Sequence, residues 1–128
     1  MTIAEYCVFS AVIIYLLTLA PAKVIGSPRF NNAKPRDSAF YETPLRARAL
    51  GAHTNGIETF PFFATAVLLA EFRHSPQTHI NELAMAFIVV RLAFVVAYLS
   101  NFPTTRTILW NVGFFLNAWL FFLPALST

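Results

Sequence analysis

Apolar residues dominate the chain, and polar residues interrupt them at three places. The interruptions lie at residues 26–43, 73–76 and 101–103, and each contains proline. The stretches 6–22 and 107–128 carry no charge, and each is as long as the roughly 20 residues that a membrane-spanning helix needs. The pattern predicts four helices, over residues 3–24, 44–72, 79–100 and 105–123.

The helix predicted over residues 44–72 has the clearest start. Thr43 has the residue type of an N-cap, and Pro44 stands at the first helical position, where its missing N–H is harmless. Pro61 lies inside the same helix, where it removes one backbone hydrogen bond and crowds the carbonyl of Ile57. We therefore expect a kink in this helix beside Glu58.

Composition places these helices in a membrane. The mean hydropathy is +0.60, and charged residues make up only 12% of the chain. We expect an all-α membrane protein, a four-transmembrane-helix bundle formed by one domain over residues 1–128. The pI of about 9.4 does not indicate nucleic-acid binding, because the basic residues lie in the loops. The single cysteine and three histidines show no metal-ligand spacing, so we expect no metal site.

Loop charge predicts the orientation. Six basic residues surround the first polar segment, whereas the second polar segment has only Arg73. The positive-inside rule then puts the first and third loops in the cytoplasm and both termini on the non-cytoplasmic side. The six residues are Lys23, Arg29, Lys34, Arg36, Arg46 and Arg48.

Polar residues share one face of the second predicted helix. Steps of three and four residues bring together Arg48, Gly51, Asn55, Glu58 and Phe62. His53 points elsewhere, and we expect it to hydrogen-bond a neighbouring helix. The same spacing on the third helix places on one face Arg91, Phe94 and Tyr98.

Two opposite charges lie at matching depth in these helices. With a rise of 1.5 Å per residue, Glu58 lies about 18 Å and Arg91 about 15 Å from the cytoplasmic surface. Charges at membrane depth are costly unless paired, so we expect a Glu58–Arg91 ion pair between the helices. Such a pair could serve a ligand site or only fix the register of the two helices.

The polar residues of the cytoplasmic half form a candidate pocket. Arginine, amide and hydroxyl donors suit a small anionic ligand that carries carboxylates. Tyr98 could instead anchor the membrane interface, and Arg106 could simply mark the end of the fourth helix. The candidate residues are Arg48, Asn55, Glu58, Tyr98, Arg106 and Thr107.

These residues carry a resemblance to a known family. RALGAHTNGIETFPFF, residues 48–63, followed by AVLLAE resembles the second helix of the MAPEG family, the membrane-associated proteins in eicosanoid and glutathione metabolism. VRLAFVVAYL, residues 90–99, resembles the third helix of that family. The loop segment FNNAKPRD resembles that of its bacterial members, which favours a bacterial inner membrane. The resemblance spans nearly the whole chain.

The resemblance implies a homotrimer that binds glutathione between neighbouring protomers. Asn55, Glu58 and Tyr98 match positions that hold glutathione, and Arg48 lies on the same helix face. Arg106 matches the arginine that stabilises the glutathione thiolate, and Thr107 stands where a serine can assist. The implied activity is that of a transferase or peroxidase, in which the thiolate attacks a lipophilic electrophile or peroxide that arrives from membrane lipids.

Two positions depart from the family pattern and support a second hypothesis. Gly51 replaces an arginine that binds a glutathione carboxylate in eicosanoid enzymes, and Phe94 replaces a tyrosine or histidine. The second hypothesis is a non-catalytic membrane protein of the same fold that binds a lipid or another anionic small molecule. A third reading, a small multidrug transporter, fits less well because the membrane carboxylate Glu58 lies in the second helix beside Asn55.

Overall fold

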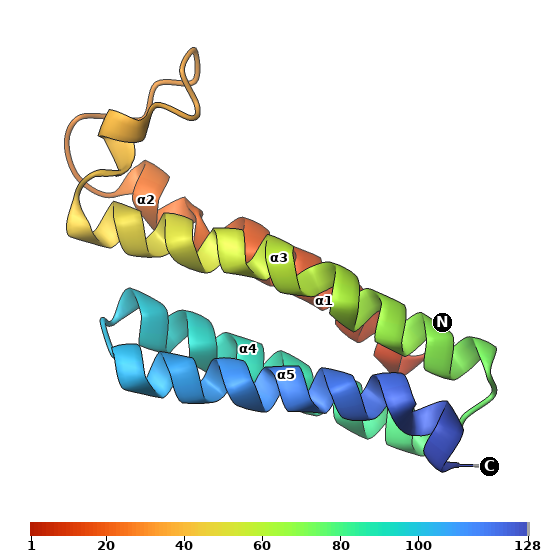
Figure 1. Cartoon of the computed structure of the whole chain (residues 1–128). Coiled ribbons are helices and arrows are strands. Elements are labelled where there is room, and N and C mark those ends of the chain that lie inside the picture. The colour runs from red at the N-terminus through yellow and green to blue at the C-terminus, as the bar shows by residue number, and fades with distance from the viewer. Residues whose placement is uncertain (128) are drawn as a thin grey trace.

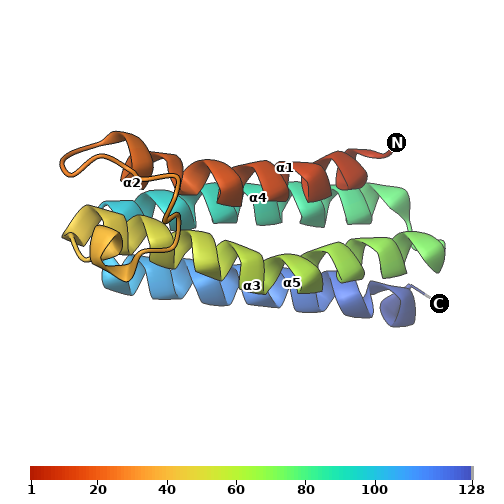
Figure 2. The same ribbon diagram turned by 90° about the horizontal axis from the view of Figure 1, so that it is seen from above.

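The computed structural model describes residues 1–127 and is built from helices throughout. Four long helices, α1 (Ile3–Thr18), α3 (Pro44–Phe72), α4 (Gln77–Leu99) and α5 (Pro103–Leu126), lie side by side (Figures 1 and 2). A short α2 (Ala20–Val24) and a 3-10 turn η1 (Ser38–Tyr41) belong to the connection between α1 and α3. The all-α prediction is confirmed.

Both ends of the chain lie at one end of the bundle, which we call the terminal end. The connection from α2 to α3 and the turn between α4 and α5 lie at the opposite end, which we call the loop end (Figure 1). The α3 helix contacts α1, α4 and α5. Residues on different sides of α3 therefore face different neighbours, and this decides which of its polar groups meet.

The first predicted helix is divided in two. α1 ends at Thr18 and α2 begins at Ala20, with Leu19 between them. Pro21 explains the break, because it has no N–H and its ring crowds the carbonyl of Leu17 four residues earlier. The Leu19 N–H instead reaches the carbonyl of Leu16 at 3.4 Å.

The second predicted helix has the same bounds as α3. Thr43 does occupy the N-cap position, but its side chain makes no capping hydrogen bond. α3 runs unbroken through Pro61, and the kink there stays a prediction. α4 starts two residues before the predicted position, and α5 runs from Pro103 to Leu126, past both predicted limits.

The core is densest toward the terminal end, where small residues let the helices approach closely. Phe63 of α3 stacks on Phe87 of α4 with ring centroids 4.1 Å apart. Gly56 brings α3 against α1, because a Cβ there would overlap the Cβ of Tyr15. His53 also binds α1, with its Nδ1 2.6 Å from the Tyr15 carbonyl oxygen, as the sequence predicted.

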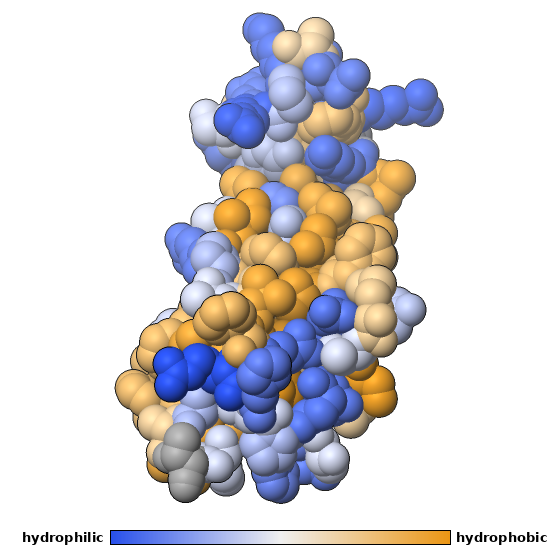
Figure 3. Space-filling model, turned by 90° about the vertical axis from the view of Figure 1, so that its right-hand side faces the viewer, coloured by the Kyte–Doolittle hydropathy of each residue, from blue (hydrophilic) through white to orange (hydrophobic). Residues whose placement is uncertain are grey.

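The outer surface of the bundle is apolar. Phe9, Val89 and Phe115 are each more than 60% exposed, which soluble proteins avoid over contiguous patches. Figure 3 shows a hydrophobic middle band below a hydrophilic top that corresponds to the loop end. Three segments are long and apolar enough to cross a membrane: Ile3–Val24, Gln77–Leu99 and Pro103–Leu126. α3 falls short of that apolarity because it carries the polar face described above.

One buried arginine holds the loop end together. Arg46 is 3% exposed, and its guanidinium donates to the carbonyls of Ala22 at 3.2 Å, Ile25 at 3.2 Å, Pro28 at 2.8 Å and Phe40 at 3.4 Å. It also stacks over the Phe40 ring at 4.0 Å. The α2–α3 connection has few regular backbone hydrogen bonds, so this side chain determines its path.

We predict that Arg46→Leu loosens the α2–α3 connection. The loss of four charge-assisted hydrogen bonds lowers stability by about 1–3 kcal/mol, because carbonyls remain unsatisfied. The melting temperature should fall, and trypsin should cleave faster after Arg29 and Arg36. Arg73→Leu, an exposed arginine at the terminal end, is the control. Equal cleavage rates in the two variants would contradict the anchoring role.

Candidate functional site

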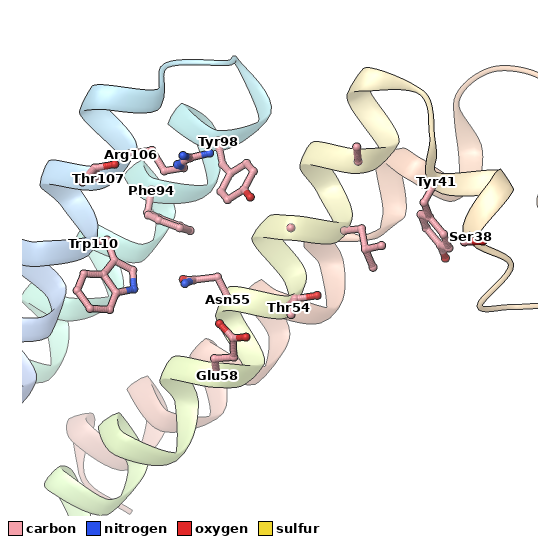
Figure 4. Close-up of a pocket in the computed structure, with 13 residues that line it drawn as sticks. Ser38, Tyr41, Thr54, Asn55, Glu58, Phe94, Tyr98, Arg106, Thr107 and Trp110 are labelled. Carbon is pink, nitrogen blue, oxygen red and sulfur yellow. The ribbon is translucent and has the colours of Figure 1, made fainter.

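A groove of about 730 Å³ lies near the loop end, between α3 on one side and α4 with α5 on the other. Figure 4 shows side chains from both sides directed toward it. The α3 helix contributes Asn55 and Glu58, α4 contributes Tyr98, and α5 contributes Arg106 and Thr107. Five of the six residues expected in a pocket thus line one groove, although they lie up to 52 positions apart (107 − 55) in the chain.

Arg48 is the sixth residue, and the structure places it outside this groove. Its Nε donates to the carbonyl of Leu99 at 3.0 Å. That carbonyl belongs to the last turn of α4, where helix carbonyls have no partner within the helix and a cation is favourable. The helical spacing placed Arg48 on the same face of α3 as Asn55 and Glu58, but its side chain is hydrogen-bonded to the C-terminal end of α4.

Arg106 presents a free cation to the groove. Its guanidinium stacks on the Tyr98 ring at 4.4 Å, and within residues 1–127 its side chain has no hydrogen bond or ion pair. Guanidinium offers five N–H donors and stays charged in proteins. The groove therefore holds an anion-binding group whose donors are unused by the protein.

Glu58 presents a free carboxylate, so the predicted Glu58–Arg91 ion pair is wrong. Arg91 instead donates from Nη1 to the Oδ1 of Asn55 at 2.9 Å and stacks over the Phe94 ring at 4.2 Å. Matching depth was insufficient, because Arg91 is 6% exposed and faces the bundle interior beside Tyr15 of α1. Glu58 lies on the exposed side of α3, and no hydrogen bond or ion pair to it occurs within the described residues.

The Arg91 contact also orients Asn55. Arginine is only a donor, so the Asn55 atom that it contacts is the amide oxygen. The amide nitrogen is then free to donate into the groove, and Figure 4 shows it on the groove side. Thr107 is less available, because its hydroxyl donates to the Pro103 carbonyl at 3.0 Å.

Sequence reasoning missed several lining residues. Trp110 follows Arg106 by one helical turn, so the same spacing argument could have found it. Figure 4 shows Trp110 across the groove from Asn55 and Glu58. Ser38 and Tyr41 come from η1 in an irregular connection, where no periodicity predicts direction. No cluster of metal-ligating side chains occurs among residues 1–127.

The fold and the groove together define a class: a helical membrane bundle with a polar, partly charged pocket near one surface. Residues 3–126 match the model of the MAPEG family. The chain belongs to the MAPEG family, whose fold is a bundle of four transmembrane helices, and it is an integral membrane protein. Membership assigns it to a family of glutathione-related membrane enzymes. Comparison with curated proteins and with solved structures gave no match.

We predict that Asn55→Leu destabilises the protein more than Glu58→Gln does. Asn55→Leu removes the hydrogen bond to a buried cation, which costs about 1.5–3 kcal/mol, whereas Glu58 has no partner to lose. Asn55→Asp keeps the acceptor and should retain stability. Thermal unfolding in detergent measures all three variants. A loss in Glu58→Gln as large as in Asn55→Leu would mean that Glu58 does bind Arg91.

Proposed function

We propose that the protein is a membrane glutathione-dependent transferase or peroxidase that acts on lipophilic electrophiles. The observation that carries this proposal is the pair of unpaired charges, Arg106 and Glu58, on opposite sides of one groove. An unpaired charge near membrane depth is expensive, so such groups indicate a binding role. One cation and one anion together suit a zwitterionic ligand.

Glutathione fits these groups. It carries two carboxylates, one ammonium group and a thiol, and the groove volume of about 730 Å³ is large enough for a tripeptide. When bound, glutathione supplies a thiol that becomes a strong nucleophile once it is ionised. The Arg106 guanidinium stabilises negative charge beside it and so favours the ionised form.

The remaining residues of the groove orient the ligand. The Glu58 carboxylate accepts from an ammonium group, and the free Asn55 amide nitrogen donates to a carboxylate. The Tyr98 hydroxyl lies against Gly51 of α3, at the edge of the groove. The Thr107 hydroxyl can leave the Pro103 carbonyl by rotation about one bond and donate into the groove beside Arg106.

The outer wall of the groove suits a lipophilic second substrate. Trp110 stacks on Phe114 with ring planes 9° apart, and both rings are exposed on α5. A molecule dissolved in the bilayer can approach along this aromatic face without leaving an apolar environment. The electrophile would then reach the groove from the lipid side and not from water.

The exposed carboxylate supports assembly into a homotrimer with glutathione between protomers. In a lone protomer Glu58 would face lipid, which costs several kcal/mol. A second copy that packs on this side of α3 would shield it and close the groove. The loop end carries most of the basic residues, so we place it on the cytoplasmic side of a bacterial inner membrane, with both termini on the other side.

A second candidate is a non-catalytic protein that binds a lipid or another anionic molecule at the same groove. Gly51 and Phe94 favour it, because both line the groove and neither offers a side-chain hydrogen bond. Binding without turnover of any electrophile would distinguish this candidate from the transferase.

We predict that glutathione binds the detergent-solubilised protein saturably in a calorimetric titration. Arg106→Ala should weaken binding about ten- to hundredfold, since it removes a charge-assisted hydrogen bond. It should also abolish conjugation to an aryl halide, while Arg73→Ala at the terminal end behaves as the wild type. Wild-type affinity in Arg106→Ala would remove the guanidinium from the mechanism, and no binding to the wild type would refute the glutathione proposal.

A further inference from the structure

Gly51 stands in the middle of a helix, where glycine is an unfavourable residue. Relative to alanine, glycine weakens a helix interior because its backbone loses more freedom on folding. Its presence in α3 therefore calls for a reason at this position. The reason lies across the groove, on α4.

The Tyr98 ring occupies the space beside the Gly51 Cα. A Cβ built at position 51 would overlap the Tyr98 hydroxyl, would lie 2.8 Å from the ring carbon that bears it, and would lie 3.2 Å from Cε1. The hydroxyl oxygen and Cζ of Tyr98 are thus too close for a side chain at position 51, and Cε1 would be a tight contact. The ring can lie against the α3 backbone only because residue 51 is glycine.

Two other contacts hold Tyr98 as well. Its ring meets Phe94 edge-on, with centroids 5.7 Å apart, and carries the Arg106 guanidinium at 4.4 Å. A tyrosine has only two side-chain torsions, so it cannot yield to a new atom at position 51 and keep both contacts. Relief of the overlap must displace the ring from Phe94 and from Arg106.

We propose that Gly51 is a positioning residue for Arg106 and acts through the Tyr98 ring. Contact passes from the α3 backbone to a ring on α4 and from that ring to the guanidinium on α5. Gly51 thus offers no side-chain donor to the groove, but it leaves room for the Tyr98 ring on which the Arg106 guanidinium stacks. As regards catalysis this inference rests on the proposed function, whereas its geometry does not.

Gly113 provides a matched control. It is also a glycine inside a membrane helix, and a Cβ there would meet only ordinary contacts, the nearest being Phe87 Cε2 at 3.5 Å. Gly113→Ala should therefore keep or raise the melting temperature through helix propensity. Gly51→Ala, the same chemical change, should lower it. On a Tyr98→Leu background, Gly51→Ala should no longer lower it.

The deciding experiment observes Arg106 without ligand. In the wild-type protein, ring current from Tyr98 should shift the NMR signal of the Arg106 Nε–H proton upfield, and the signal is assigned by its loss in Arg106→Lys. Gly51→Ala should move it toward its position in Tyr98→Leu, while Gly113→Ala leaves it in place. An unmoved signal in Gly51→Ala would overturn the proposal, whether or not the protein binds glutathione.

A second readout tests the consequence for the thiol. If the guanidinium is displaced, the pKa of the bound glutathione thiol should rise by about one unit, which is a tenfold loss of thiolate. Thiolate absorbance measured against pH follows this pKa. A shift in Gly51→Ala with none in Gly113→Ala supports the positioning role. Failure of glutathione to bind the wild type would refute the proposed function alone, since the NMR comparison stands without it.

Discussion

The hydrogen bond from Arg91 to Asn55 decides how the polar groups of this bundle are used. Arg91 is buried, no carboxylate among the described residues pairs with it, and its Nη1 donates to the Asn55 amide oxygen at 2.9 Å. A buried cation without a partner would cost more than a helix bundle can tolerate. A neutral amide satisfies part of this need. Glu58, one turn further along α3, faces outward from the bundle, so its carboxylate is left free. The same contact turns the Asn55 amide nitrogen toward the groove.

The groove follows from this division of roles. Glu58 on α3 and Arg106 on α5 keep their charges unpaired, and no side chain of the described chain neutralises either. The two arginines in the first turn and a half of α3 are engaged by backbone: Arg46 binds four carbonyls, and Arg48 binds the Leu99 carbonyl. Arg106 has only the face of the Tyr98 ring. Among the residues that line the groove, Arg106 is thus the arginine whose donors are unused.

Much of the fold could be predicted from hydropathy and proline positions. Pro44 marks the start of α3 correctly, and the stripe of spaced polar residues places Asn55 and Glu58 on the groove. The predictions for the Glu58–Arg91 ion pair and for Arg48 failed for the same reason. The sequence indicates the depth of a residue and the helix face on which it lies, but not which neighbouring helix that face contacts. Arg91 and Glu58 are at similar depth on surfaces that point apart, and Arg48 is drawn to the end of α4. The Gly51–Tyr98 contact joins two residues that are 47 positions apart (98 − 51) on different helices, and only the three-dimensional structure reveals it.

The central claim is that Arg106 and Glu58 are kept unpaired to hold one zwitterionic ligand. A crystal structure grown from a lipidic mesophase with glutathione present tests it most directly. We expect electron density for a tripeptide in the groove, with its sulfur beside Arg106 and its ammonium group beside Glu58, while Arg91 remains hydrogen-bonded to Asn55. An empty groove with Glu58 bound to Arg91 would contradict it.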